Sequence, residues 1–367
     1  MDRRAFLILS AAGLLQPDAA ASPPGSPDTP GGPDPQTAAF QAWLRDFTIR
    51  AIAAGWDGQL VTEQLAGLTV NPKVVELDTK QPEFVKSTGD YVRQSVTEAR
   101  VEAGRRKRAD VPQFPDIVAR YGVPSEILTA IWSQESAFGT IQGDLDVIRS
   151  LASLAFDGRR RDWAETQILS AFRMIQEGDA TRAQMRGSWA GAMGQTQLIP
   201  EAFLTVAVDG DGDGKRDIWN DWADILGSIA NYFKKSGWQT GEPVADPATR
   251  SVDWKGPEPS NALELAETVG SLEKQGYVFS TSEPTDAPAA AFALEASASS
   301  SEFWIGYHNF KVITRYNRSP KYALAAHQLG QAIRSSYAAT ASPNARDTAV
   351  VSVEPVHAAL SARSTPP

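Results

Sequence analysis

A glutamate occupies an apolar position in the helical pattern of residues 124–139. Leu128, Ile131 and Trp132 recur at three- and four-residue spacing, which places them on one face of a helix. Glu135 continues the same stripe, where another isoleucine or leucine is expected. The pattern therefore predicts a helix that carries a carboxyl group on the face that packs against the core.

The surroundings of Glu135 favour the protonated form of its carboxyl group. Pro124 suits the first helical position and Gly139 suits a left-handed stop, so Glu135 lies near the helix C-terminus. Desolvation by apolar neighbours, the negative end of the helix dipole and cover from Phe138 all act to raise its pKa. We interpret Glu135 as a proton donor. The alternative is a side chain that reaches solvent at a frayed helix end.

Composition limits the chemistry that the chain offers. Its 367 residues suffice for two domains, and 42% hydrophobic with 22% charged residues is ordinary for a soluble globular protein. The 35 Lys+Arg and 44 Asp+Glu give a net charge of -9, and the one large basic block, residues 105–108, is interpreted as a solvated helix end. Nucleic acid is therefore not expected as a partner. Because the sequence has no cysteine and three histidines, thiol chemistry, disulfides and most His-based metal sites are excluded.

The N-terminal segment has the features of an export signal. Two arginines, Arg3-Arg4, precede an apolar run that extends to Leu15, and small residues follow up to position 21. The run is too short for a permanent membrane-spanning helix. The paired arginines indicate a twin-arginine signal, although general secretory signals also carry such pairs. We expect a periplasmic protein, and not a lipoprotein because the chain lacks cysteine.

Patterns along the rest of the chain indicate its organisation. A mainly α protein is predicted, with an N-terminal helical domain and a small strand-containing insertion. Composition and periodicity divide it into an export signal (1–21), a disordered linker (22–36), an N-terminal helical domain (37–110), a core (111–237), a small strand-containing insertion (238–301), a helical return to the core from Phe303-Trp304 onward (302–337) and a disordered tail (338–367).

The stretch from Gly187 to Pro200 is rich in small residues and amides. Its glycines and alanines let a backbone approach a ligand or another helix closely. Ser188, Gln195 and Gln197 offer hydroxyl and amide groups that suit sugar hydroxyls and acetamides. The alternative is close packing of small residues without a binding function.

An acidic loop follows at residues 209–220. Asp209, Asp211 and Asp213 stand at positions one, three and five, with glycine at position six, as an EF-hand loop requires. Position twelve is Asn220 in place of the usual bidentate glutamate. The pattern predicts a calcium site, and the alternative is a solvated acidic turn.

These motifs together resemble a known family. The chain resembles the membrane-bound lytic transglycosylase B type of peptidoglycan-cleaving enzyme, which is lysozyme-like. The resemblance covers roughly residues 37–335 and implies a lysozyme-like α+β core for the region that carries Glu135. The motifs, in order, are Tyr121 to Pro124, Glu135-Ser136 with Phe138-Gly139, Leu151 to Asp157 followed by Arg159-Arg160, Gly187 to Pro200, Ser228 to Phe233 and Asn309 to Ser319.

The resemblance implies roles for individual residues. Glu135 matches the catalytic acid/base, and Ser188 and Gln197 match polar residues beside it. Leu198 stands where some relatives have an aromatic residue, so one sugar-stacking contact is in doubt. The residues that match the lining of the glycan groove are Tyr91, Tyr232, Tyr316, Asn317 and Tyr322.

The resemblance also bears on the metal site. It implies a slightly longer loop closed by a later carboxylate, for which Asp224 is favoured and Asp221 is the alternative. Asp217, at position nine, would bind the ion directly or through water. The calcium ion would be structural, and no cofactor is expected for catalysis.

The reaction implied by the resemblance is cleavage of the β-1,4 bond between N-acetylmuramic acid and N-acetylglucosamine, leaving a 1,6-anhydro end. The partners expected are peptidoglycan strands, together with proteins of cell-wall synthesis or remodelling, and the chain is expected to be a monomer. One alternative is a hydrolytic muramidase on the same scaffold. A non-catalytic peptidoglycan-binding protein is the other.

Overall fold

The computed structural model describes residues 34–80, 87–251, 254, 264–293 and 303–340. The predicted signal peptide, residues 22–33 of the predicted linker and residues 341–367 of the predicted tail lie outside these ranges. The described residues form mostly helices with one small sheet and a two-stranded ribbon, which confirms the mainly α prediction. None of the described helices combines the length and hydropathy needed to cross a bilayer.

The helices are α1 (Pro35–Ala53), α2 (Gly58–Leu65), α3 (Pro72–Lys80), α4 (Thr88–Ser95), α5 (Glu98–Asp110), α6 (Phe114–Tyr121), α7 (Ser125–Ser136), α8 (Val147–Asp157), α9 (Arg161–Glu177), α10 (Pro200–Val206), α11 (Trp222–Lys235), α12 (Val269–Lys274), α13 (His308–Tyr316) and α14 (Pro320–Thr340). The strands are β1 (Leu145–Asp146), β2 (Arg186–Gly187), β3 (Ala245–Arg250), β4 (Glu267–Thr268), β5 (Tyr277–Phe279), β6 (Pro288–Ala293) and β7 (Phe303–Gly306).

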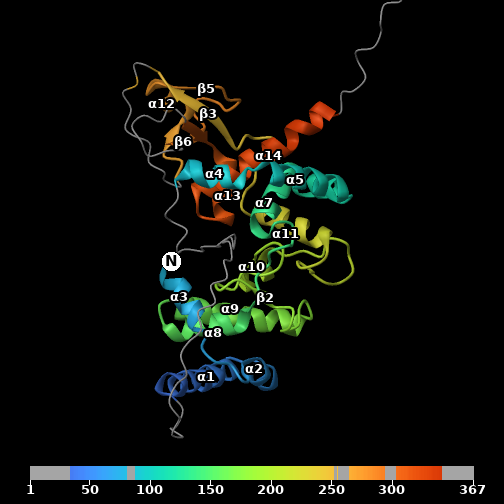
Figure 1. Ribbon diagram of the computed structural model, residues 1–367, viewed down its shortest axis with the longest axis vertical. Helices are drawn as coiled ribbons and strands as arrows, with labels where there is room; N and C mark the ends of the chain where they lie inside the picture. The colour runs from blue at the N-terminus through green and yellow to red at the C-terminus, as the bar shows by residue number, and fades with distance from the viewer. Residues whose placement is uncertain (1–33, 81–86, 252–253, 255–263, 294–302, 341–367) are drawn as a thin grey trace, which may run out of the picture.

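The described elements are arranged in successive layers along the long axis of the molecule (Figure 1). Helices α1 and α2 lie at one end, and the pair α8–α9 forms the next layer. Helix α7 packs against α5, α11 and α14 near the middle, and the sheet lies at the opposite end. The helix that carries Glu135 is therefore surrounded by other helices rather than placed at an edge.

The N-terminal helices contact two separate parts of the chain. Helices α2 and α3 pack on α9 and α8, and Glu165 on α9 accepts a hydrogen bond from Trp43 (3.2 Å) and pairs with Arg50 (2.8 Å) on α1. Helices α4 and α5 pack instead on α14. One continuous apolar core joins both groups, from Phe40 to Ala326. The domain boundary at residue 110 stays a prediction.

The sheet contains a strand that the sequence patterns missed. Its order is β4-β6-β7-β3-β5, with antiparallel pairs throughout. The prediction that helix returns at Phe303-Trp304 is wrong, since these residues form β7 between β3 and β6. Phe303 pairs with Ala248 on one side and with Ala293 on the other. Pairing on both edges and burial of Phe303 outweigh the local helical pattern, and helix returns only at α13.

Two helix ends differ from the predicted boundaries. Helix α1 begins at Pro35, within the predicted linker, because the Asp34 carboxylate accepts hydrogen bonds from the first free backbone amides and caps the helix. At the other end of the chain, α14 continues to Thr340, beyond the predicted start of the tail at residue 338. Both helices are thus slightly longer than expected.

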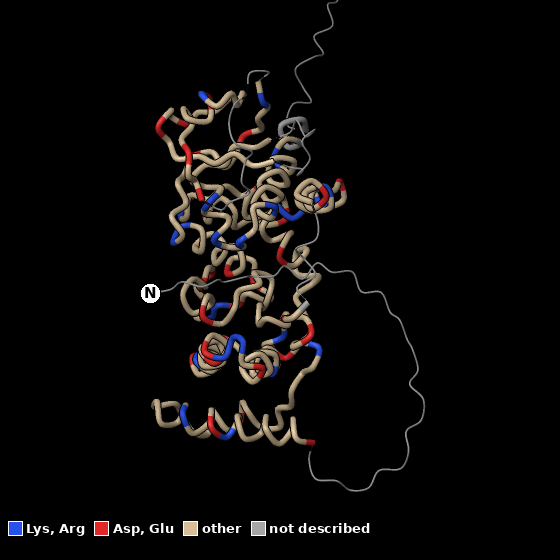
Figure 2. Tube along the Cα trace, turned by 90° about the vertical axis from the view of Figure 1, so that its left-hand side faces the viewer, with Lys and Arg blue, Asp and Glu red and all other residues tan. Residues whose placement is uncertain are grey.

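The sequence predicts that the basic block at residues 105–108 is a solvated helix end. In the structure two of its side chains also contact other helices. Lys107 lies 5.8 Å from the ring centroid of Trp132 and 5.1 Å from that of Trp222. Arg108 donates a hydrogen bond to the hydroxyl of Ser125 (2.8 Å). The block therefore joins α5 to α7 and α11. Figure 2 shows basic and acidic residues interspersed along the described chain.

Candidate active site

Helix α7 presents Glu135 at its last turn. The helix starts at Ser125, with Pro124 at the cap position rather than at the first helical position. It ends at Ser136, and the left-handed residue that caps it is Ala137, with φ 47°, so the predicted stop at Gly139 is wrong. Gly139 is left-handed as well, with φ 86°. The chain therefore turns sharply one residue after Ser136.

Left-handed backbone at residues other than glycine is confined to this neighbourhood within the described chain. Ala137 (φ 47°) and Phe138 (φ 59°) follow α7, and Gln197 (φ 50°) lies in the glycine-rich stretch. Such residues cost roughly 1–3 kcal/mol each and persist where surrounding contacts hold them. Here the Ser136 hydroxyl supplies such contacts, because it accepts from the amide of Gly139 (3.0 Å). Two strained residues thus follow the last turn of α7, which carries Glu135.

The carboxyl group of Glu135 is buried, with only 1% of the residue exposed. Burial raises its pKa from 4.5 to about 8, and a hydrogen bond from the Tyr322 hydroxyl to Oε1 (2.5 Å) partly opposes this shift. The second oxygen, Oε2, is buried with no partner among the described residues. The predicted rise in pKa is confirmed with desolvation as its cause, and the alternative of a solvated end is wrong.

Three tyrosines from three helices surround this carboxyl. Burial raises the pKa of Tyr316 and Tyr322 well above the usual value and that of Tyr232 to about 12, and the charge on Glu135 adds to each shift. The Tyr316 hydroxyl donates to the carbonyl of Thr196 (2.6 Å), and its ring centroid lies 4.6 Å from that of Tyr232. All three phenols therefore stay protonated near neutral pH and can act as neutral hydrogen-bond donors.

The remaining residues expected to line a groove have different environments. Tyr91, on α4, is close enough to Tyr322 to contribute to its raised pKa, and it is only partly buried. Asn317 caps the C-terminus of α13 and is 7% exposed. Leu198, at the position where some relatives have an aromatic residue, is fully buried in the apolar core. Leu198 therefore contributes to the packing of the core in this structure.

The side chains of Ser188 and Gln197 both form hydrogen bonds to backbone groups of the loops around them. The Ser188 hydroxyl oxygen accepts from the amides of Ala190 (3.3 Å) and Ala192 (3.1 Å). The Gln197 side-chain nitrogen donates to the carbonyls of Gln142 (3.1 Å) and Gly194 (2.9 Å), and its Oε1 is buried without a partner among the described residues. The Ser188 hydrogen and the Gln197 oxygen are thus the polar groups left for a ligand.

Gln195 does not offer its amide to a sugar, contrary to the sequence-based expectation. Its Oε1 accepts from the indole N–H of Trp132 (2.7 Å), and its Nε2 donates to the carbonyl of Trp219 (2.7 Å). Both ends of the amide are therefore used within the protein. The sequence could not reveal this, because the two partners lie far from Gln195 along the chain.

Among the described residues, no second carboxyl group shifts the pKa of Glu135. Only burial and Tyr322 shift it. Ordinary retaining and inverting glycosidases use two carboxyl groups at defined separations. The arrangement instead suits one group that gives up a proton and then recovers it.

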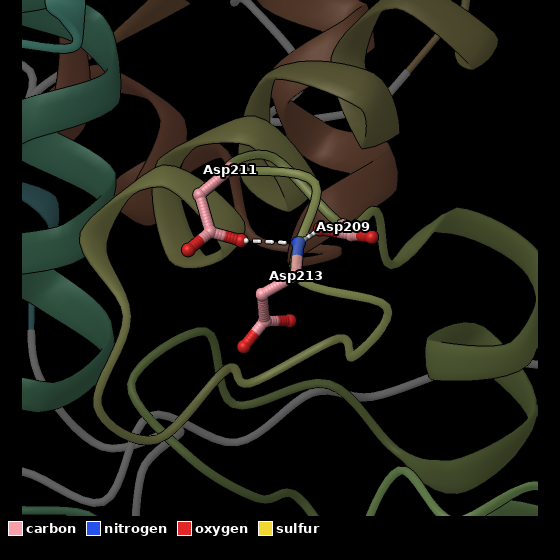
Figure 3. Close-up of side chains that lie close together, drawn as sticks. All are labelled: Asp209, Asp211 and Asp213. Carbon is pink, nitrogen blue, oxygen red and sulfur yellow. Dashed lines mark hydrogen bonds between the residues drawn. The ribbon is translucent and has the colours of Figure 1, made fainter.

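The acidic loop gathers three of the predicted metal ligands. Asp209, Asp211 and Asp213 each offer a carboxylate oxygen within 4.8 Å of the others (Figure 3). Asp209 also accepts from the amide of Gly214 (2.9 Å), and these backbone bonds lower its pKa. The loop is therefore held in a turn with its carboxylates together, and the donor set fits a hard cation such as Ca²⁺.

The other candidate ligands do not join this group of three, and their carboxylates accept hydrogen bonds from backbone amides instead. These residues are Asp217, Asp221 and Asp224. Asp224 accepts from the amides of Gly210 (2.6 Å) and Asp217 (2.5 Å), which ties the two sides of the loop together. Burial, aided by the charges of Asp221 and Asp211, raises the pKa of Asp224 to about 6. Asp221 caps α11, and Asp217 accepts from the amide of Trp219 (2.9 Å).

The fold and site define a class of protein: a mainly helical molecule with a buried carboxyl of raised pKa at the end of a central helix. Comparison with known families is consistent with this class. The family model described as "Transglycosylase SLT domain" matches residues 39–331, so the chain belongs to this family.

Individual relatives belong to the same class of enzyme. The chain is 34% identical over 226 residues to membrane-bound lytic murein transglycosylase B of Escherichia coli (strain K12), over 60% of this chain and 61% of the relative's length. It resembles SltB3 of Pseudomonas aeruginosa in complex with NAG-NAM-pentapeptide, with TM-score 0.71, 36% identity and coverage of 81% and 80% of the two chains. It also resembles the Escherichia coli lytic transglycosylase Slt35 in complex with calcium, with TM-score 0.67, 28% identity and coverage of 79% and 92%. The fold is therefore lysozyme-like, as predicted.

The raised pKa of Glu135 makes a testable contribution to stability. Unfolding returns the pKa from about 8 to 4.5, so between these values the folded state binds more protons than the unfolded state. Glu135 therefore makes a stabilising contribution to the free energy of unfolding. This contribution is fully present below the unfolded-state pKa and is lost as pH rises through the folded-state pKa. Glu135→Gln cannot ionise, so its Tm should rise relative to wild type between about pH 5 and about pH 8.

Calorimetry at both pH values measures this difference. Glu126→Gln is the matched control, since Glu126 lies on the same helix but pairs with Arg108 (3.8 Å) and Arg334 (3.6 Å) near the surface. Its Tm difference from wild type should not grow with pH. A Tm difference for Glu135→Gln that is the same at both pH values would contradict a carboxyl held protonated by burial.

Proposed function

We propose that the chain is a peptidoglycan lytic transglycosylase that cleaves the β-1,4 bond between N-acetylmuramic acid and N-acetylglucosamine. The observation that carries the proposal is the burial of Glu135, whose pKa of about 8 keeps a proton available at neutral pH. Family membership supports the substrate class, as does the likeness to SltB3 in its complexes with NAG-NAM-pentapeptide and NAG-anhNAM-pentapeptide. The product would carry a 1,6-anhydro-muramyl end.

The first step breaks the glycosidic bond. Protonated Glu135 donates its proton to the glycosidic oxygen while the bond from that oxygen to C1 of the muramyl sugar breaks. The N-acetylglucosamine chain leaves with a new hydroxyl group. The acetamide of the muramyl sugar stabilises the positive charge at C1, which replaces the second carboxylate of ordinary glycosidases.

The second step closes the anhydro ring. The C6 hydroxyl of the same sugar forms a bond to C1, and the Glu135 carboxylate takes the proton released from that hydroxyl. Glu135 is thereby protonated again and no water is consumed. The Tyr322 hydroxyl donates to Oε1 (2.5 Å), so it would orient the carboxyl and stabilise the short-lived carboxylate.

The other predicted groove residues belong to the same proposal. Four residues would border the bound glycan around Glu135. They are Tyr91 on α4, Tyr232 on α11, Tyr316 on α13 and Asn317 at the C-terminal cap of α13. Three of these elements pack on α14 or α13, which supports a common binding surface. Ser188 and Gln197 would contribute the hydroxyl hydrogen and the amide oxygen that local contacts leave available.

We place the activity in the periplasm. The N-terminal sequence with Arg3-Arg4 and its apolar run supports export, with the twin-arginine route favoured over the general secretory route. Peptidoglycan strands would be the principal partner, with proteins of cell-wall synthesis or remodelling as further partners, and the enzyme would act as a monomer.

Mass spectrometry of products from purified murein tests the reaction. Wild type should release muropeptides with 1,6-anhydro ends, whereas a hydrolytic muramidase would give ends heavier by one water. Glu135→Gln keeps the shape of the side chain but holds no transferable acid proton, so turnover should fall at least about 100-fold. Binding of NAG-NAM-pentapeptide should persist in this variant.

Glu126→Gln is again the control and should keep activity close to that of wild type. Wild-type activity should also fall on the alkaline side near the pKa of about 8, since the deprotonated form lacks the acid proton. Turnover by Glu135→Gln within tenfold of wild type would disprove the role of Glu135. Wild type that binds murein without releasing any product would indicate a non-catalytic binding protein.

We further propose that the acidic loop holds a structural calcium ion, through Asp209, Asp211 and Asp213. The grouping of their oxygens within 4.8 Å supports this, as does the calcium complex of the relative Slt35. Asp217 and Asp224 would complete the site directly, through water or by holding the loop, with Asp221 as the alternative closing residue. The bound ion would offset repulsion among these carboxylates and stabilise the start of α11.

Calcium should raise the Tm of protein first treated with a chelator, because a ligand that binds only the folded loop stabilises the folded state. The double variant Asp209→Ala/Asp213→Ala should lose this shift. The double variant Asp116→Ala/Asp162→Ala removes the same charge from exposed positions in the first turns of α6 and α9, and should keep the shift. An equal calcium-dependent shift in the Asp209→Ala/Asp213→Ala variant would place the ion elsewhere.

A further inference from the structure

Gln195 connects the catalytic helix to the segment that follows the acidic loop. Its side chain accepts from the indole N–H of Trp132 on α7 and donates to the carbonyl of Trp219, with both distances 2.7 Å. The amide group therefore bridges two segments that are 87 residues apart, from position 132 to position 219. Gln195 itself is 7% exposed, so little water competes for these bonds.

The backbone of Gln195 makes the same connection a second time. Its carbonyl accepts from the Ser136 hydroxyl (2.9 Å), and its amide donates to the carbonyl of Ile218 (2.8 Å). Ser136 directly follows Glu135, and Trp132 precedes Glu135 by one helical turn. Four hydrogen bonds from one residue thus hold the last turn of α7 against residues 218–219.

Glycines allow this close approach. A Cβ atom at Gly139 would lie 2.6 Å from the side-chain amide carbon of Gln195, and one at Gly194 would lie 2.7 Å from the carbonyl oxygen of Ile218. Both positions are also left-handed, with φ 86° and 63°. The amide of Gln195 is therefore packed directly against the sharp turn that ends α7, and a side chain at position 139 would collide with it.

Aromatic packing supports the same connection. Trp222, the first residue of α11, has its ring centroid 6.3 Å from that of Trp132, in an edge-to-face arrangement. The ring centroid of Phe138 lies 5.1 Å from that of Trp132, also edge-to-face. Trp132 is thus fixed between the left-handed turn and α11, with Gln195 as its hydrogen-bond acceptor.

We infer that Gln195 is a positioning residue, which fixes the end of α7 against residues 218–219 and thereby sets the place of the Glu135 carboxyl. This inference rests on the proposed role of Glu135 in cleavage. Gln195 does not touch the reacting atoms in this account. Its contribution is to keep Glu135 in line with the glycosidic oxygen and in its water-poor environment, because a shift of about 1 Å can lower a rate about 100-fold.

The test compares two buried glutamines. Gln195→Met keeps the length and volume of the side chain but removes both amide bonds. Gln167→Met is the matched control, because Gln167 is also buried and also uses both ends of its amide, donating to the Glu201 carboxylate (2.8 Å) and accepting from the Glu201 amide (3.0 Å). These contacts join α9 to α10, away from α7.

Steady-state cleavage of soluble glycan fragments across pH separates positioning from general destabilisation. Gln195→Met should lower kcat about 10- to 100-fold with KM changed less than about threefold. The alkaline limb of its pH–rate profile should move to lower pH. A loosened turn admits water to Glu135, which lessens the desolvation that raises the pKa of its carboxyl. Among the described residues, the titratable groups whose pKa values respond to the charge of Glu135 are Tyr232, Tyr316 and Tyr322, and their raised pKa values keep them out of this range.

Gln167→Met should lower the Tm by an amount comparable to that of Gln195→Met, but should keep kcat within about threefold of wild type. The alkaline limb of its pH–rate profile should stay in place. If Gln195→Met matches this control in kcat and in its pH profile, the inference is wrong. Ser136→Ala is a second variant for the case in which Gln195→Met does not fold, because it removes one of the four bonds to Gln195 together with the bond from the Gly139 amide to the Ser136 hydroxyl. It should shift kcat and the alkaline limb in the same directions, and an unchanged profile would also overturn the inference.

Failure of the proposed function gives a different result. In that case wild type itself would release no anhydro product, whereas failure of this inference alone leaves wild type active and Gln195→Met indistinguishable from Gln167→Met.

Discussion

The burial of one carboxyl group is the constraint on which the rest of the site depends. Glu135 receives a single hydrogen bond from the described residues, from Tyr322, and that bond compensates only part of the desolvation. The cost of burial is lowest when the group keeps its proton, which gives the protein an acid at neutral pH. The surrounding helices and the neutral tyrosines on α11, α13 and α14 maintain that environment.

Local patterns predicted the buried carboxyl and the acidic cluster better than they predicted the contacts around them. Glu135 was recognisable because it interrupts an apolar stripe, and Asp209, Asp211 and Asp213 because EF-hand ligands follow a fixed spacing. The bond from Tyr322 was not predictable from pattern, since the two residues are 187 positions apart and only the packing of α14 on α7 brings them together. For the same reason Gln195 resembled a sugar ligand rather than a bridge.

The errors in the fold have a similar origin. Phe303 has neighbours at helical spacing, but pairing with β3 and β6 on both edges makes it the start of a central strand. Ala137 ends α7 in a left-handed conformation that favours glycine or asparagine, so the sequence pointed to Gly139 instead. In the first case contacts from distant segments outweighed the local preference. In the second the strained residues adjoin the helix turn that carries the buried carboxyl, and the Ser136 hydroxyl helps to hold them.

A direct titration of Glu135 tests the central claim. Carbon-13 NMR of glutamate side-chain carboxyl groups, with Glu135→Gln used to assign the signal, follows ionisation without reference to any substrate. We expect a midpoint near 8 for Glu135. A midpoint near the ~4.3 of a free glutamate would show that the carboxyl is ionised and hydrated at neutral pH, and would contradict the account.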